Sequence, residues 1–169
     1  MIVALDVHYR TACAQVGCVA FEDWQAPQAS RTHTVTVERV ADYQSGQFYK
    51  RELPCLLTAL EEMPDAAATI VIDGYVWLAP ERPGLGWHLH QALDGRVAVV
   101  GVAKSSFAGN ATARPVCRGR SRRPLYVTSC GMKPDAAATA VADMAGPNRI
   151  PTMLKLADTL SRTASQEDQ

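Results

Sequence analysis

A short apolar run near the middle of the chain ends abruptly in an acidic residue. Residues 70–72 read Ile-Val-Ile and are followed directly by Asp73 and Gly74. A continuous run of β-branched residues is typical of a strand that is buried on both faces of a parallel sheet. The run therefore predicts an α/β fold in which a central strand delivers a carboxylate at its carboxyl end.

Two other acids are predicted to lie close to Asp73. Asp6 follows the opening apolar run 2–5, and Glu52 lies near the start of a helix whose leucines recur at spacings of three and four. Carboxylates from three separate elements indicate divalent-metal chemistry, because hard cations prefer oxygen ligands. The competing interpretation is that the two aspartates form strand-end turns and that Glu52 caps its helix.

The order of the predicted elements indicates the fold class. In chain order they are strands at 2–7, 11–21 and 32–40, a helix at 48–62, a strand at 68–73, a helix at 86–93, strands at 96–102 and 125–128, and helices at 136–144 and 152–161. The first three strands follow one another through turns and read as antiparallel, whereas the later alternation with helices implies parallel crossovers. We therefore expect an α/β fold with a ribonuclease-H-like mixed sheet, in which three antiparallel strands are followed by parallel strands with flanking helices.

Composition limits the classes of protein to consider. A chain of 169 residues with 47% hydrophobic residues is long enough for one domain with its own core, which we expect to span residues 1–169 with a frayed carboxyl end. The formal net charge is zero, so a nucleic-acid surface would have to be a local patch. We find neither a signal peptide nor an apolar run long enough for a membrane span, and we expect a cytoplasmic protein without membrane contact.

The dense positive run of the sequence lies between residues 114 and 123. Its arginines are Arg114, Arg118, Arg120, Arg122 and Arg123. Such a run fits contact with nucleic-acid phosphates, which release counterions when arginine neutralises them. We select Arg118 and Arg120 as candidate substrate contacts, and a solvated surface hairpin is the alternative.

Several segments, taken together, resemble endonuclease V. They are ALDVHY (4–9), YQSGQFYKRE (43–52), VIDGYVWLAPERPGLGWHL (71–89), GVAKSSF (101–107), LYVTSCGMK (125–133) and RIPTMLKLADTLSR (149–162). Each segment alone is a weak signal, but their order and spacing are jointly specific. The resemblance implies a ribonuclease-H-like fold and an enzyme that requires Mg²⁺ or Mn²⁺. It also implies cleavage of DNA, or in some members RNA, one nucleotide beyond an inosine on its 3′ side.

The resemblance implies roles for four residues around the reacting phosphate. Asp6, Glu52 and Asp73 match the metal-binding acids of the family, and Lys104 matches a lysine near the scissile phosphate. A lysine there could neutralise charge that develops on the phosphate. The alternative for Lys104 is an ordinary surface lysine after a strand.

Further matches concern recognition of the base. Tyr43 and Gly46 match a wedge loop that separates the strands at the lesion, although this chain lacks the proline of that loop. Gly74, Gly84 and Leu85 match positions around the flipped hypoxanthine. An aromatic wedge suits such recognition because it fills the gap that an extruded base leaves.

The chain also departs from the family pattern. We expect Met132 to replace an active-site histidine, and Ala79 to replace a second histidine. A thioether cannot act as a base and binds magnesium poorly. Asp135 could replace the missing ligand, or it could simply compensate a helix dipole.

Three functions follow from these observations. The first is a metal-dependent endonuclease that acts on inosine-containing nucleic acid, with DNA preferred over RNA. The second is a module of the same fold that binds nucleic acid or nucleotides without efficient cleavage. The third is a small-molecule phosphoesterase or a protein-interaction domain. The sequence leaves the oligomeric state open and favours a monomer.

Overall fold

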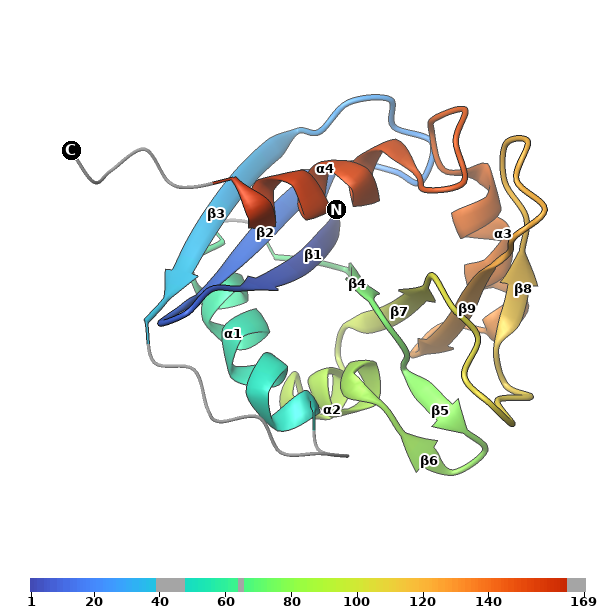
Figure 1. Cartoon of the computed structure of the whole chain (residues 1–169), viewed down its shortest axis with the longest axis horizontal. Helices are drawn as coiled ribbons and strands as arrows, with labels where there is room; N and C mark the ends of the chain where they lie inside the picture. Colours follow the sequence, from blue (N-terminus) through green and yellow to red (C-terminus); the bar gives the residue numbers. More distant parts are fainter. Residues whose placement is uncertain (39–47, 64–65, 164–169) are drawn as a thin grey trace.

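A seven-stranded mixed sheet forms the centre of the molecule (Figure 1). The computed structural model describes residues 1–38, 48–63 and 66–163. The strands are β1 (Ile2–Tyr9), β2 (Ala14–Phe21), β3 (Arg31–Val37), β4 (Thr69–Asp73), β5 (Trp77–Ala79), β6 (Arg82–Pro83), β7 (Ala98–Ala103), β8 (Arg114–Val116) and β9 (Leu125–Cys130). The helices are α1 (Tyr49–Glu61), α2 (Leu85–Ala92), α3 (Pro134–Asp143) and α4 (Thr152–Arg162).

The strand order of the large sheet is β3-β2-β1-β4-β7-β9-β8. Strands β1, β2 and β3 are antiparallel neighbours, whereas β1, β4 and β7 run parallel to one another. The predicted mixed sheet is therefore confirmed. The parallel part ends at β7, because β9 returns antiparallel to β7 and β8 pairs antiparallel with β9.

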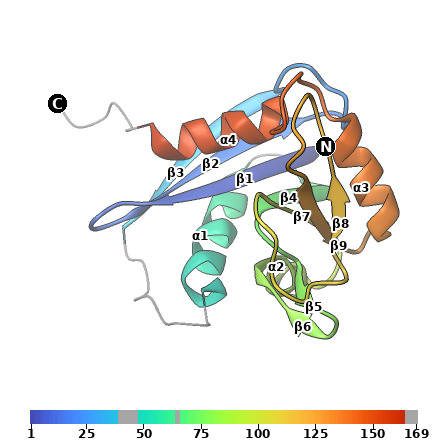
Figure 2. The same ribbon diagram turned by 45° about the vertical axis from the view of Figure 1, so that its right-hand side comes forward.

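Helices cover both faces of the sheet. Along β1 the side chains alternate, so that Val3 and Leu5 join the core beneath α1 and α2, while Ile2 and Ala4 join the core beneath α3 and α4. Figure 2 shows α4 and α1 on opposite sides of the strands. The central strands are therefore buried on both faces, as their continuous apolar runs predict.

Two short elements lie where the sequence predicts none. Residues 79–84, expected to be a loop, contribute to the β5–β6 hairpin, whose turn includes Glu81 at a φ of 58°. Strand β8 lies at the start of the arginine-rich run and completes one edge of the sheet. The longest helix in the described part of the chain is α1, and none of the helices there is long and apolar enough to cross a membrane.

The parallel strands place three of the candidate residues at one edge of the sheet. Leu5 of β1 is in register with Ile72 of β4, and Asp73 is in register with Val102 of β7. Asp6 and Asp73 therefore follow equivalent positions on neighbouring strands, and Lys104 comes two residues after Val102. Parallel strands share their carboxyl edge, which is where such folds place ligands.

Candidate functional site

Asp6 is a buried carboxylate on the face of β1 that α4 covers, and α4 holds it in place. It is 9% exposed, and the Oγ of Ser161, which is 0% exposed, donates a hydrogen bond of 2.5 Å to Asp6 Oδ2. Burial raises the pKa of Asp6, and the bond from Ser161 opposes that rise. The charge of Asp73 raises the pKa further.

Gly17 explains how α4 approaches closely enough for this contact. It is the register partner of Asp6 on β2, and a Cβ at this position would lie 2.3 Å from the backbone oxygen of Ala157. The same Cβ would lie 2.7 Å from the backbone nitrogen of Ser161. The missing side chain therefore allows the helix backbone to lie directly over β2.

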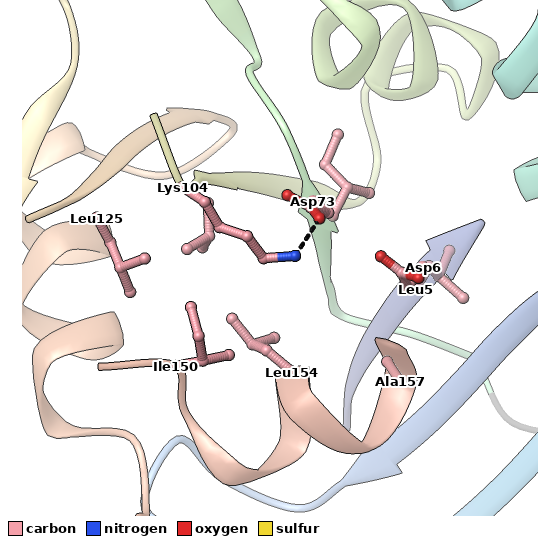
Figure 3. Close-up of a pocket in the computed structure, with 10 residues that line it drawn as sticks. Leu5, Asp6, Asp73, Lys104, Leu125, Ile150, Leu154 and Ala157 are labelled. Atoms are coloured by element: carbon pink, nitrogen blue, oxygen red, sulfur yellow. Dashed lines mark hydrogen bonds and ion pairs between the residues drawn. The ribbon is translucent and has the colours of Figure 1, made fainter. Parts of the chain in front are cut away.

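Asp73 carries an ion pair with Lys104. The Nζ of Lys104 lies 2.6 Å from Asp73 Oδ2, and both side chains are partly exposed. Figure 3 shows Lys104 and Asp6 on opposite sides of Asp73, above apolar side chains that include Ile150 and Leu154. Burial alone would lower the pKa of Lys104, but the bond to Asp73 and the charges of Asp73 and Asp6 raise it. The ammonium therefore stays protonated.

Glu52 reaches the same region from the first turn of α1. It is 7% exposed. Burial raises the pKa of Glu52 to about 8, and the negative charges of Asp6 and Asp73 add to the effect. The three predicted acids are thus close enough to perturb one another, although they come from two strands and a helix.

The chemistry of this cluster suits a divalent cation. Among the described residues, no three His, Cys, Asp or Glu side chains form a group that could hold a metal ion as they stand. Burial, together with the charge of Asp73, raises the pKa values of Asp6 and Glu52, so a cation between these carboxyl groups would favour their ionised forms. Hard oxygen donors of this kind fit Mg²⁺ or Mn²⁺. The ammonium of Lys104 supplies part of the balancing charge.

Sequence reasoning missed two residues next to this cluster, Ser161 and Asp158. Asp158 accepts hydrogen bonds from Lys155 at 2.6 Å and from Arg162 at 2.8 Å, and its charge acts on both Asp6 and Lys104. Burial would raise the pKa of Asp158, but the two bonds lower it to about 2. Asp158 is therefore a fourth carboxylate at the site. Its position one turn before Ser161 on α4 is the sequence signal that could have revealed it.

A second cavity of about 370 Å³ begins at Asp73. Gly74, Gly84 and Leu85 line it, together with aromatic side chains that include Phe107. The structure therefore brings together the three residues that the resemblance associates with an extruded base. Their roles remain predictions.

Two glycines, Gly74 and Gly101, allow the backbone beside this cavity to turn and to pack closely. Gly74 has a φ of 127°, which residues with a side chain rarely adopt. Glycine at this position therefore allows the chain to turn sharply after Asp73. At Gly101 on β7, a Cβ would lie 2.6 Å from the Gly74 carbonyl oxygen and 2.8 Å from the Val76 nitrogen. The turn thus packs directly on the neighbouring strand. Tyr43 and Gly46, the predicted wedge, lie outside the described residues.

The structure contradicts the assignment of Met132 to the active site. Val127 of β9 lies opposite Val102, whereas Cys130 lies opposite Val99, so β9 runs away from the edge that carries Asp73. Cys130 is three residues, or roughly 10 Å, farther along, and Met132 lies beyond it in the core beneath α3 and α4. A histidine at Met132 would therefore not reach Asp73.

The positions of Asp135 and Ala79 show that neither residue belongs to the acid cluster. Asp135 forms an ion pair of 2.6 Å with Arg114 at the start of α3, so it does not replace a ligand near Asp73. Ala79 lies in β5 and lines neither the cavity of Asp6 nor that of Gly74. Neither residue changes the acid cluster.

Arg118 must be removed from the predicted phosphate contacts. It is 6% exposed, and its guanidinium donates to backbone carbonyls at the end of α3 and in the loop after it, including Ala142 at 3.2 Å and Asn148 at 2.8 Å. A guanidinium that is committed to carbonyls cannot also bind a phosphate. Arg120 is exposed, and its contact with substrate stays a prediction.

Comparison with known proteins adds independent information. A sequence profile described as Endonuclease V matches residues 1–159. An endonuclease V of Streptomyces avermitilis is 33% identical over 146 residues, which cover 74% of this chain and 62% of that protein. An endonuclease V of Nostoc punctiforme is 31% identical over 113 residues, which cover 67% of this chain and 49% of that protein. The chain thus spans about half to three fifths of the length of these relatives.

Solved structures agree with the fold. The crystal structure of the Streptomyces avermitilis endonuclease V has a TM-score of 0.77 and 25% identity, with 95% of this chain and 79% of that chain covered. Endonuclease V of Ciona intestinalis in complex with a 24mer DNA containing an inosine has a TM-score of 0.75 and 19% identity. That match covers 95% of this chain and 84% of the other, and it supports the shared fold.

Proposed function

Because the chain belongs to the endonuclease V family, we propose that it is a metal-dependent endonuclease acting on inosine-containing nucleic acid, with DNA preferred over RNA. The bond to be hydrolysed is a phosphodiester on the 3′ side of the inosine. The observation that carries this proposal is the cluster of Asp6, Glu52 and Asp73 beside Lys104 at the carboxyl edge of the parallel strands.

In this proposal, Asp6, Glu52 and Asp73 would hold Mg²⁺ or Mn²⁺. When bound, such a cation lowers the pKa of an attacking water and stabilises the leaving oxygen. Glu52 has a pKa of about 8, so without a cation it carries a proton at neutral pH. Binding of a cation therefore requires that this proton be released from the Glu52 carboxyl group.

Lys104 would orient the substrate. Its ammonium lies 2.6 Å from Asp73 and remains protonated, so it offers a positive charge at the position where the scissile phosphate would approach. A phosphate oxygen can accept the hydrogen bond that Asp73 accepts in the free protein. Lys104 then turns from Asp73 to the substrate and leaves the carboxylate available to a cation.

The cavity next to Asp73 would receive the extruded base. Gly74, Gly84 and Leu85 line it, and its volume of about 370 Å³ accommodates a purine. Tyr43 and Gly46 would form the wedge that separates the strands. The target phosphodiester would then lie between this cavity and Lys104.

A second function is favoured by one observation. In the free protein Asp73 is paired with Lys104. Among the described residues, no three His, Cys, Asp or Glu side chains are arranged to hold a metal ion. A protein with this arrangement could bind inosine-containing nucleic acid without cleaving it efficiently.

The experiment that decides between the two uses a labelled duplex with one inosine. Purified protein is incubated with the duplex in Mg²⁺ or in Mn²⁺, and products are resolved on a denaturing gel. We expect a single cut on the 3′ side of the inosine, and we expect Asp73→Asn to lower the single-turnover rate by at least about 10²-fold. Asp94→Asn is the matched control, because Asp94 is exposed and paired with Arg96.

The outcomes separate the proposals. Cleavage that is lost in Asp73→Asn but kept in Asp94→Asn supports the endonuclease. Inosine-selective binding without cleavage in either metal supports the binding module instead. Absence of binding to any nucleic acid would reject both.

A further inference from the structure

A separate cavity lies on the far side of Lys104 from the acids. Its volume is about 310 Å³. The lining residues are Lys104, Ser105, Ser106, Arg122, Arg123, Pro124, Tyr126 and Arg149. Four of these side chains are cationic, three carry hydroxyl groups, and none is a carboxylate. The cavity thus offers hydrogen-bond donors and positive charge to a ligand.

The two exposed arginines of this cavity have no acidic partner among the described residues. Within residues 1–38, 48–63 and 66–163, neither the Arg122 nor the Arg123 side chain forms an ion pair, whereas Arg114 pairs with Asp135 and Arg96 pairs with Asp94. Two guanidinium groups in one cavity without a carboxylate concentrate positive charge there. An anion bound in the cavity would balance that charge.

Arg149 fixes the backbone that carries these groups. Its guanidinium donates to the carbonyl oxygens of Arg123 at 2.9 Å, Pro124 at 2.8 Å and Lys104 at 2.5 Å. It therefore ties the segment after β7 to the segment before β9, which are the two walls of the cavity. A site whose walls are already joined loses little conformational freedom when a ligand binds.

The cavity also adjoins the acid cluster. Lys104 lines both this cavity and the one that contains Asp6 and Asp73. A strand whose scissile phosphate lies at Lys104 would therefore run on past the serines and arginines. Its next phosphate would face the unpaired guanidinium groups.

We infer that Arg122, Arg123, Ser105 and Ser106 form a second phosphate-binding subsite that holds a backbone phosphate next to the one that is cut. This inference rests on the proposed function, because it places the same nucleic-acid strand at Lys104. The subsite contributes affinity and register, while the acid cluster carries the chemistry.

The test compares two double variants that remove the same charge. In Arg122→Ala/Arg123→Ala the subsite loses both guanidinium groups. In Arg96→Ala/Lys133→Ala two exposed cations are lost at the opposite edge of the sheet. Affinity for the inosine-containing duplex is measured by fluorescence anisotropy in Ca²⁺, across salt concentrations from about 50 to 200 mM.

We expect the subsite variant to bind about tenfold more weakly, and we expect the slope of log K against log salt to fall by about 1 to 2. Its single-turnover rate at subsaturating substrate should fall by the same factor as its affinity. The control variant should retain its affinity within about twofold, since non-specific charge loss is largely screened at these salt concentrations.

Each remaining outcome counts against the inference. Equal affinity and slope in the two variants would overturn it, even if the unaltered protein cleaves inosine duplexes as proposed. Calorimetric binding of inorganic phosphate that disappears in the subsite variant, with duplex affinity unchanged, would assign the cavity to free phosphate instead. Failure of the proposed function has a different signature, namely no cleavage by the unaltered protein.

Discussion

The two sides of Lys104 carry side chains of opposite charge. On one side lie Asp6, Glu52 and Asp73, where burial and the neighbouring negative charges raise the pKa values of Asp6 and Glu52. On the other side lie Arg122 and Arg123 in a cavity without a carboxylate. The acidic side can bind a cation and the basic side can bind an anion. A phosphodiester strand together with a divalent cation satisfies both at once.

This contrast explains why the overall charge of the chain is uninformative. The formal net charge is zero, which argues against a global basic field but not against local segregation. Acids and arginines meet at Lys104 because the parallel strands end there and because β9 begins beside the end of β7. Tertiary structure thus creates a local dipole that composition averages away.

The largest effect on cleavage should follow from removing the positive charge of Lys104, which lies between the acidic and the basic side. We expect Lys104→Met to lower the single-turnover cleavage rate by about 10²- to 10³-fold, because charge on the phosphate would no longer be stabilised. We also expect Mn²⁺ to bind more tightly, since Asp73 would lose its competing ammonium. Lys133→Met serves as the control, and Mn²⁺ affinity is measured by calorimetry. Unchanged cleavage would show that the two sides act independently.

A smaller effect should appear in the pH dependence of stability. Glu52 has a pKa of about 8 in the folded state against 4.5 as its ordinary value. The folded state therefore binds the proton more tightly, and stability without divalent cations should fall as pH rises from about 4.5 to about 8. The loss should be on the order of a few kcal/mol.

The variant Glu52→Gln should flatten this dependence, because the amide does not titrate. The free energy of unfolding is obtained from urea titrations in EDTA at the two ends of the pH range. Glu61→Gln on the exposed part of α1 is the control and should keep the full dependence. Addition of Mg²⁺ should restore stability at the higher pH. A flat profile in the unaltered protein would mean that burial and the neighbouring acids do not raise the pKa of Glu52.

The smallest effect concerns the contact between α4 and the acidic side. Ser161→Ala should lower the free energy of unfolding by about 1 to 3 kcal/mol, because the buried Asp6 carboxylate loses its hydrogen bond. It should also raise the pKa of Asp6 further, since Ser161 opposes the effect of burial. Thermal unfolding measures the first change. Thr159→Ala on the exposed face of α4 is the control, and equal losses in both variants would argue against a specific role for Ser161.

Much of the fold could be predicted because its signals are local. The buried run that ends in Asp73 and the leucine spacing around Glu52 each depend on fewer than 15 consecutive residues. The parallel arrangement of β1, β4 and β7 then followed from the alternation of strands and helices. These features were sufficient to bring Asp6, Asp73 and Lys104 to one edge.

The features that sequence reasoning missed depend on distant parts of the chain. Ser161 lies 155 residues from Asp6, and their contact requires the absence of a side chain at Gly17. The motif around Met132 contains no information about the direction of β9, so it wrongly predicts an active-site position for Met132. Arg118 donates to carbonyls at the end of α3 and in the loop after it, and the arginine-rich run alone cannot reveal which of its arginines is buried.

The contact between Ser161 and Asp6 has a consequence for how the protein is made. During synthesis β1 emerges first, and α4 emerges after more than 140 further residues have been added. Until then the Asp6 carboxylate has no hydrogen-bond donor from α4, and the apolar floor contributed by Leu154 and Ala157 is absent. A growing chain that has already formed most of its sheet therefore still lacks a complete acid cluster. Assembly of the site becomes a late event, coupled to the docking of a single helix.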